Sequence, residues 1–507
     1  MKRFYLIGWL LIAGLLGVQA QEVDMGTEQQ VEAGRKLYMQ KCAHCHGEEG
    51  DGNGVAKPFF RPQPRDFTAA TFKFRSTLSG ELPTTEDIKR SIKKGMPYTG
   101  MPGWPQLSDK EITNLAYFIK TFSEEDFRDF GNAESITIPD PPPITEESIQ
   151  RGRIVYEENQ CADCHGDKGR GNGKSAPTLK DQWDQPIRPA DLTKRWTFRG
   201  GPTRKDIYRT FTTGLDGSPM PSYDIQPEED KWALVNYVYS LGASDEPNYA
   251  IAAMAVAREG ALELSRGRAL FEDAPAALFP VVGQVVEPGR NFYPGVNAIE
   301  VRAVYNQEDI AIMLTWHDMT ADTTGHNAPD LEAPPFDPEH DPAAPYTGEF
   351  SDAVAIQFPS KMPEGAERPY FLFGDAKRSV DLWFADLAKG EPAFYIGRGS
   401  ENIRPGDQPL EMISRYDDGE WMVIFKRRRA PEKGLAFVPE TFVPIAFSVW
   451  DGFNNERGNR RGITSWYHLY LEPMEKESPL IPTLRSGLIT FVVLAGLVGI
   501  VRLKYRS

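Results

Sequence analysis

Two five-residue segments of this sequence share the pattern Cys-x-x-Cys-His, at residues 42–46 and 161–165. Two thiols three residues apart can add to the two vinyl groups of one haem, and the histidine that follows can then bind the iron. The pattern therefore predicts two covalently attached c haems. The residues concerned are Cys42, Cys45 and His46 in the first segment, and Cys161, Cys164 and His165 in the second.

Each of these patterns could also be half of a zinc site. Zinc would need further cysteine or histidine ligands at regular spacing, and the chain has only 4 cysteines, all of them inside the two patterns. Haem attachment is therefore the favoured interpretation, and it leaves no cysteine for a disulfide framework.

The second axial ligand of each iron has methionine candidates in loops that contain Met-Pro. Met101 and Met220 each follow the first cysteine of their motif by 59 residues. Met96 is a further candidate, but Leu215 stands at its place in the second half of the repeat. We therefore predict Met101 and Met220 as axial ligands. Two six-coordinate irons are suited to electron transfer rather than to binding peroxide.

Both haem motifs lie in a longer internal repeat with an offset of 119 residues. Glycines 47, 50, 52 and 54 recur as glycines 166, 169, 171 and 173. So many glycines predict a tight loop with positive φ angles, in which the backbone can approach the edge of the haem.

Helices are expected on both sides of these loops. Apolar spacing predicts a first helix at residues 32–40 and a last helix at 109–121, with Ser108 as the N-cap of the last one. The last helix has a twin within residues 228–241. Between the two repeats, residues 123–148 are acidic and then proline-rich, which predicts an extended, stiff spacer.

From residue 260 onward, short alternating runs of β-branched and aromatic residues replace the helical pattern. Residues 298–305 and 310–316 form the clearest pair of strands, joined by a turn. Short strands at such intervals predict an all-β sandwich, preceded at 242–268 by a connector with helical character and containing a long loop at 320–348. Further strands are expected at residues 353–358, 370–372, 380–384, 421–426, 443–449 and 465–471.

Both ends of the chain carry targeting signals. Residues 1–20 combine a basic start, an apolar segment and a small-residue cleavage site, which predicts a signal peptide, with an uncleaved anchor as the alternative. Residues 482–503 are long and apolar enough for one transmembrane helix, and the basic residues after them place the C-terminus in the cytoplasm. The bulk of the chain is therefore expected on the periplasmic side of the cytoplasmic membrane. A net charge of -15 argues against nucleic acid as a partner.

Residues 28–122 and 149–241 each resemble a class I cytochrome c in the haem motif, the glycine loop and the Met-Pro loop. The resemblance implies two small all-α domains, each a helical bundle around one haem with histidine and methionine ligands. In such domains a glycine and an aromatic residue of the first helix, here Gly34 and Tyr38, pack against the last helix.

Five blocks in the second half also resemble a known group. They are IMLTWHD at 312–318, DAVAIQFP at 352–359, YFLFGD at 370–375, VDLW at 380–383 and FSVWDG at 447–452. In this order they resemble the haem-binding gamma subunit of ethylbenzene dehydrogenase and its relatives. Those relatives are electron-transfer subunits of type II dimethyl sulfoxide reductase-family molybdoenzymes, such as nitrate, chlorate and selenate reductases and nitrite oxidoreductase.

The second resemblance implies a β-sandwich that can hold a b haem between a methionine and a lysine. At the corresponding places this chain has Phe373 and Arg460–Arg461. Arginine stays protonated and is a very poor iron ligand. His317, with Asp318 and His326 nearby, could suggest a metal site, but a strand-end histidine hydrogen-bonded to a loop is the favoured interpretation.

Together these observations predict a dihaem c-type cytochrome that transfers electrons and has no evident catalytic site of its own. The resemblance implies a membrane-anchored subunit of a periplasmic molybdenum oxidoreductase. Its partners would be molybdenum and iron–sulfur subunits, and a soluble cytochrome or a membrane redox complex. One alternative makes the sandwich a ligand- or partner-binding module without a redox centre. A dihaem peroxidase would need an open iron position, which Met101 and Met220 argue against.

The predicted organisation is multidomain, with two all-α cytochrome c domains, an all-β sandwich domain and one C-terminal transmembrane helix. The expected parts are a signal peptide at 1–20, cytochrome c domain 1 at 28–122, a proline-rich linker at 123–148, cytochrome c domain 2 at 149–241, the sandwich at 260–475 and the membrane helix at 482–503.

Overall fold

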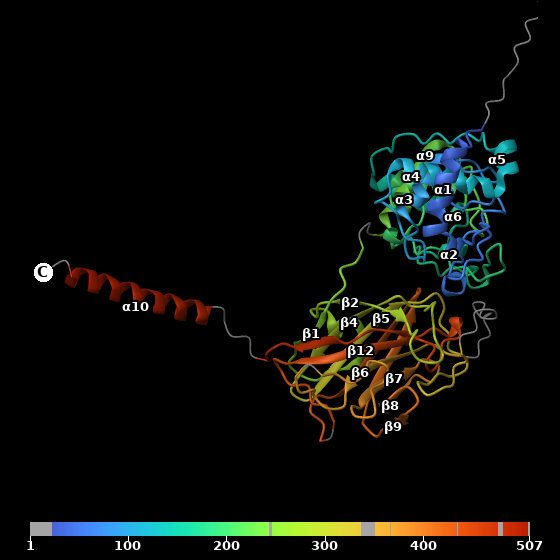
Figure 1. Cartoon of the computed structure of the whole chain (residues 1–507). Coiled ribbons are helices and arrows are strands. Elements are labelled where there is room, and N and C mark those ends of the chain that lie inside the picture. The colour runs from blue at the N-terminus through green and yellow to red at the C-terminus, as the bar shows by residue number, and fades with distance from the viewer. Residues whose placement is uncertain are drawn as a thin grey trace, which may run out of the picture. The chain divides into compact units, whose positions relative to one another are not determined.

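The structure is a computed structural model that describes residues 23–242, 246–335, 350–365, 367–432, 434–474 and 480–504. The predicted signal peptide and much of the long loop at 320–348 lie outside these residues. The chain divides into two compact units, a helical unit of residues 1–169 and 178–245 and a sheet unit of residues 170–177 and 246–507 (Figure 1). A helical first half followed by a sheet-rich second half is what the sequence predicts.

The helical unit contains the same helices twice in the same order. We call residues 28–122 the first repeat and residues 149–241 the second repeat. The first repeat has α1 (Glu28–Lys41), α2 (Ala43–His46), α3 (Thr85–Lys94) and α4 (Asp109–Lys120). The second repeat has α6 (Glu146–Glu158), α7 (Ala162–His165), α8 (Arg204–Thr213) and α9 (Glu228–Ser240). Short 3-10 helices lie at Lys57–Phe59, Thr121–Ser123, Ala176–Thr178 and Arg195–Thr197.

Capping boxes set where several of these helices begin. The Thr84 and Thr203 hydroxyls accept the N–H groups of Asp87 and Asp206, whose carboxylates in turn accept from the cap backbone. Such reciprocal bonds satisfy N–H groups that the first turn of a helix leaves free. Ser108 caps α4 in the same way, as its sequence position predicts.

The first and last helices of each repeat cross at a glycine. A Cβ atom at Gly34 of α1 would lie 2.0 Å from the carbonyl oxygen of Asn114 in α4. At Gly152 of α6 it would lie 1.9 Å from the carbonyl oxygen of Ala233 in α9. Only glycine therefore allows this approach. Tyr38 is fully buried between the helices, which confirms the packing expected of Gly34 and Tyr38.

The linker between the repeats is helical at its acidic start, unlike the expected extended spacer, and carries no helix or strand at residues 133–145, where its prolines lie. Its acidic start forms α5 (Glu124–Phe130), and Phe127 of this helix is fully buried in the core of the first repeat. Further on, Ile136 and Ile138 pack against the core of the second repeat. Burial of Phe127 favours the helix at the acidic start, and burial of Ile136 and Ile138 holds the following segment against the second repeat.

The sheet unit is one mixed sheet. Its strand order is β10-β11-β5-β4-β1-β14-β12-β6-β7-β8-β9, with β2 beside β4 and β13 between β12 and β3. Strand β1 runs parallel to both of its neighbours, and the other pairs are antiparallel. The strands within the described residues are β1 (Ala252–Ala257), β2 (Ala277–Pro280), β3 (Val282–Gly283), β4 (Ala298–Tyr305), β5 (Asp309–His317), β6 (Ala353–Pro359), β7 (Val380–Asp386), β8 (Glu391–Gly397), β9 (Ile403–Pro405), β10 (Glu411–Asp417), β11 (Glu420–Arg428), β12 (Phe442–Trp450), β13 (Gly462–Ile463) and β14 (Tyr467–Leu471).

The sheet folds back on itself around one apolar core. Trp383 of β7 and Phe425 of β11 have ring centroids 6.4 Å apart, although their strands are far from each other in the strand order. Side chains from both halves of the sheet share this core. Strands β4, β5, β6, β7 and β12, which contribute to it, are labelled in Figure 1.

Two local predictions in this half were wrong. Residues 252–257, expected to be helical because of their alanines, form strand β1, which hydrogen-bonds to β4 and β14 on its two sides. Small side chains suit this central position, where tertiary contacts override helix propensity. Residues 370–372, expected as a strand, form a turn.

The chain ends in helix α10 (Leu480–Lys504), part of which, Leu484–Arg502, is long and apolar enough to cross a membrane. This agrees with the helix that the sequence predicts at 482–503.

Candidate haem-binding sites

Each predicted proximal histidine is held by one backbone carbonyl. The Nδ1 atom of His46 lies 2.9 Å from the carbonyl oxygen of Arg65, and Nδ1 of His165 lies 2.9 Å from that of Ala190. A carbonyl can only accept, so Nδ1 carries the proton and Nε2 keeps its lone pair for a metal. Burial lowers the pKa of both histidines, which keeps the rings neutral at pH 7. Both rings therefore meet the chemical requirements of an iron ligand.

The cysteines lie beside these histidines on one-turn helices. Helix α2 begins directly after Cys42 and α7 directly after Cys161, so the two thiols of each motif are about one helical turn apart. All four cysteines are free of disulfides. Burial raises the pKa of Cys42 and of Cys161 to about 11, and among the described residues neither motif belongs to a cluster of three possible metal ligands. Two thiols and a neutral histidine in each repeat fit a covalently bound c haem and fit zinc poorly.

Met101 and Met220 occupy the same position in two matching loops. The carbonyl of Met101 accepts the N–H of Met96 at 3.0 Å, and the carbonyl of Met220 accepts the N–H of Leu215 at 3.0 Å. Each loop follows the C-cap glycine of α3 or α8, with φ angles of 67° and 66°. Both predicted ligands are half-buried. The equivalence that the sequence spacing indicates is thus present in the backbone, and their binding to iron stays a prediction.

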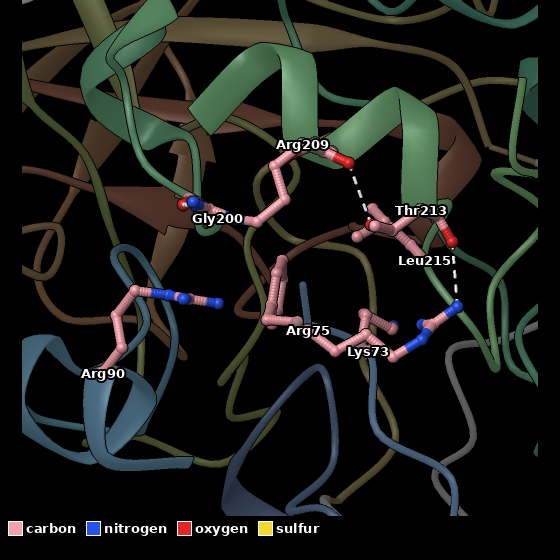
Figure 2. Close-up of a pocket in the computed structure, with 9 residues that line it drawn as sticks. Lys73, Arg75, Arg90, Gly200, Arg209, Thr213 and Leu215 are labelled. Atoms are coloured by element: carbon pink, nitrogen blue, oxygen red, sulfur yellow. Dashed lines mark hydrogen bonds between the residues drawn. The ribbon is translucent and has the colours of Figure 1, made fainter. Parts of the chain in front are cut away.

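The two repeats meet at a contact surface that we call the seam. Arg75 of the first repeat donates to the carbonyl oxygen of Thr213 in the second repeat at 2.8 Å (Figure 2). It also pairs with Asp216 of the second repeat at 2.9 Å. Asp216 also accepts from the Ser79 hydroxyl at 2.8 Å and from the N–H of Gly80 at 2.9 Å. These bonds hold the two repeats in one compact unit.

A small cavity of about 10 Å³ lies at the seam, and cationic side chains line it (Figure 2). Arg90 from α3 and Arg209 from α8 stand at equivalent positions of the repeat. Arg90 pairs with Asp87 at 2.7 Å and Arg209 with Asp206 at 2.5 Å. No sequence pattern marks the seam, because these cations belong to no motif and only packing brings them together.

Phe373 and Arg461 in the sheet unit are the residues that replace the expected ligands of a b haem. Both side chains are fully buried, and Cζ of Arg461 lies 3.8 Å from the centre of the Phe373 ring. A flat haem between two side chains needs about 3.5–4.0 Å on each face. Burial lowers the pKa of Arg461 to about 9, so it remains a cation at pH 7. These residues contact each other directly and do not fit a b haem.

The histidine at the end of β5 is bound by a loop. Nδ1 of His317 lies 2.8 Å from the carbonyl oxygen of Gly419, which is the arrangement the sequence analysis favoured over a metal site. The adjacent Asp318 belongs to a buried acidic cluster with Asp352 and Asp451, whose carboxylate oxygens lie within 4.8 Å of one another. An acidic cluster alone does not identify a ligand.

Two protein families match the chain. A family described as "Cytochrome C oxidase, cbb3-type, subunit III" matches residues 29–119 and again residues 147–238. A family described as "Ethylbenzene dehydrogenase" matches residues 268–408. The first family covers both haem motifs and the second covers Phe373.

Three curated relatives are similar to parts of the chain. A proposed respiratory nitrate reductase heme subunit of Haloferax mediterranei is 27% identical over 187 residues, 36% of this chain and 59% of that protein. The chlorate reductase subunit gamma of Ideonella dechloratans is 26% identical over 176 residues, 34% of this chain and 64% of that protein. Cytochrome c55X of Paracoccus denitrificans is 35% identical over 92 residues, 18% of this chain and 73% of that protein. The chain thus spans less than two thirds of the length of the first two.

Proposed function

Because the chain belongs to the cytochrome c family, with two cbb3-type subunit III domains followed by an ethylbenzene dehydrogenase domain, we propose that it transfers electrons as the membrane-anchored subunit of a periplasmic molybdenum oxidoreductase complex. The similarity to nitrate reductase and chlorate reductase subunits supports this choice of complex. The chain would serve such a complex without a catalytic site of its own.

The observation that carries the proposal is the repeated histidine geometry. His46 and His165 each have Nδ1 bound to a carbonyl at 2.9 Å and Nε2 left for a metal, beside two free thiols. When bound there, a c haem supplies one-electron chemistry, in which iron takes up one electron to pass from Fe(III) to Fe(II) and returns to Fe(III) on releasing it. We assign Met101 and Met220 as the second protein ligand that would hold each haem, and their thioethers would exclude water and peroxide from the iron.

The seam supports a relay between two such sites. Buried Arg75 joins the first repeat to the second through Thr213 and Asp216, and the two histidines belong to one compact unit. A fixed separation keeps the rate of transfer between the sites constant and removes the need for a collision between them.

Anchoring is proposed through α10. The helix presents an apolar stretch at Leu484–Arg502 and ends with basic Arg502 and Lys504. Basic residues favour the cytoplasmic face of a membrane, so the haem-binding repeats would lie on the periplasmic side.

The sheet unit is proposed to bind the partner without a redox centre of its own. The direct contact between Phe373 and Arg461, 3.8 Å from cation to ring centre, favours this second role. On this view electrons pass through the helical unit alone, and the sheet unit supplies specificity for the catalytic subunits.

The proposal is tested on the complex as it exists. The full-length protein is purified from detergent-solubilised membranes of its own organism, and molybdenum is counted against c haem by elemental analysis and absorbance. About one molybdenum per two c haems is expected, and its absence would contradict the proposed partner. In the same preparation, steady turnover of hydrogen peroxide would contradict the axial methionines and favour a peroxidase.

A further inference from the structure

A second group of cations lies at the seam, and it has no acid bound to it. Arg65 and Lys73 come from the first repeat and Arg199 from the second. Among the described residues none of the three forms a salt bridge, in contrast to Arg75, Arg90 and Arg209 of the seam. The members of this group, which we call the open cations, are close enough for both arginines to repel the charge of Lys73.

The open cations are partly buried and repel one another. Nη1 of Arg65 is buried and has no hydrogen-bond partner. Burial first, and then Arg65 and Arg199, lowers the pKa of Lys73 to about 8. The charge of Asp181 partly offsets this, because it raises the pKa of both Arg65 and Lys73. All three side chains are partly buried, so an anion placed among the open cations would be held by several charge-assisted bonds.

The position of Arg65 indicates which anion. Its backbone carbonyl is the group that holds His46, so its side chain starts at the edge of the first haem site. Its guanidinium lies 5.0 Å from the ring centre of Trp183 in the second repeat. A side chain rooted at one haem site therefore ends in contact with the other repeat.

A c haem is fixed covalently through its vinyl groups and carries two propionate carboxylates. We propose that Arg65, Lys73 and Arg199 bind the propionates of both haems at the seam, so that each haem is held partly by a cation of the other repeat. This inference rests on the proposed binding of one haem in each repeat. Charge-assisted bonds from arginine to carboxylate are stronger than neutral ones, and they satisfy both the cations and the acids.

The consequence is that a charge in one repeat sets the reduction potential of both haems. A cation beside a propionate favours the reduced iron, because reduction lowers the positive charge of the site. Arg199→Met should therefore lower both midpoint potentials, whereas a haem held only by its own repeat would leave one of them unchanged. Lys73→Met, on the other side of the seam, should also lower both.

The test is a spectroscopic redox titration of the full-length holoprotein in detergent. For Arg199→Met, the ratio of reduced to oxidised haem at a fixed potential should fall at least threefold for each haem. This fall corresponds to a midpoint potential lower by about 30 mV, at 59 mV per tenfold change. Arg199→Lys should restore most of the potential. The matched control is Arg153→Met, an exposed arginine of the same repeat paired with Glu157, which should change neither midpoint.

Three results would overturn the assignment. The first two are a shift of only one midpoint potential in Arg199→Met and no shift of either. The third is an equal shift in the wild type when inorganic phosphate is added, which would show that an exchangeable ion binds the open cations. Redox-difference infrared spectra give a second readout, because propionate carboxylate bands should move in Arg199→Met and stay in place in Arg153→Met. The haem count is taken first, since fewer than two c haems per chain would refute the proposed function instead.

Discussion

Replacing Arg75 with methionine should loosen the seam between the two repeats. The Arg75 side chain is fully buried and donates to three carbonyl oxygens, those of Phe72 at 3.2 Å, Leu78 at 3.0 Å and Thr213 at 2.8 Å. It also pairs with Asp216 at 2.9 Å. Methionine keeps an unbranched, flexible stem and removes every donor.

The size of the effect follows from these contacts. Removing one partner of a buried ion pair costs about 3–5 kcal/mol. The side chain of Asp216 is 21% exposed and keeps the donors of Ser79 and Gly80, so water and these groups replace part of what is lost. We therefore expect the lower end, a fall of about 3 kcal/mol in the free energy of unfolding of the helical unit. Asp216→Asn, which keeps an acceptor, should cost about 1 kcal/mol.

Urea unfolding followed by the Soret absorbance reports the helical unit, because both haem motifs lie in it. A double-mutant cycle of Arg75→Met with Asp216→Asn should give a coupling of about 1–2 kcal/mol. Arg153→Met is the surface control and should stay within about 0.5 kcal/mol of the wild type. A loss below about 1 kcal/mol for Arg75→Met, or a coupling of zero, would refute the idea that this arginine joins the repeats.

Two further changes test other parts of the structure. Gly152→Ala should lower the free energy of unfolding of the helical unit by about 3 kcal/mol, because the new Cβ would lie 1.9 Å from the Ala233 carbonyl oxygen. A melting temperature equal to that of the wild type would contradict the close crossing of α6 and α9. In the sheet unit, burial and then Asp451 raise the pKa of Glu456 to about 7, above its value of about 4.3 in an unfolded chain. The native state then binds more protons than the unfolded state between these values, so the free energy of unfolding should fall by about 2.5 kcal/mol from pH 5 to pH 8. Glu456→Gln should remove most of this pH dependence of the free energy of unfolding, measured by urea titration with tryptophan fluorescence in EDTA. A free energy of unfolding that rises from pH 5 to pH 8 in the wild type would contradict a raised pKa of Glu456.

The internal repeat allowed much of the helical unit to be predicted from the sequence. The haem motif, the glycine loop and the capping threonine of α3 each have a partner 119 residues away, and local chemistry determines their structure. Ser108 caps its helix whatever surrounds it, and the glycines at 47, 50 and 52 have the expected positive φ angles. The carbonyls that hold His46 and His165 come from residues 65 and 190, which no motif marks.

Where tertiary contacts decide, the sequence alone was a poor guide. Strand β1 is alanine-rich and becomes a strand only because β4 and β14 hydrogen-bond to it on both sides. Strands β8 and β10 are partly exposed and lack a clear apolar alternation, so no pattern predicted them. Phe373 and Arg461 are 88 positions apart in the sequence. The sequence shows that they replace the expected haem ligands, but only the structure shows that they contact each other.

This chain is expected to carry two c haems in its helical unit and no haem in its sheet unit. A pyridine haemochrome spectrum of the purified full-length protein, with haem counted per chain, tests it most directly. The account predicts two c haems per chain and no b haem. A third haem of the b type would contradict the occlusion of the sheet unit by Phe373 and Arg461, and fewer than two c haems would contradict the relay itself.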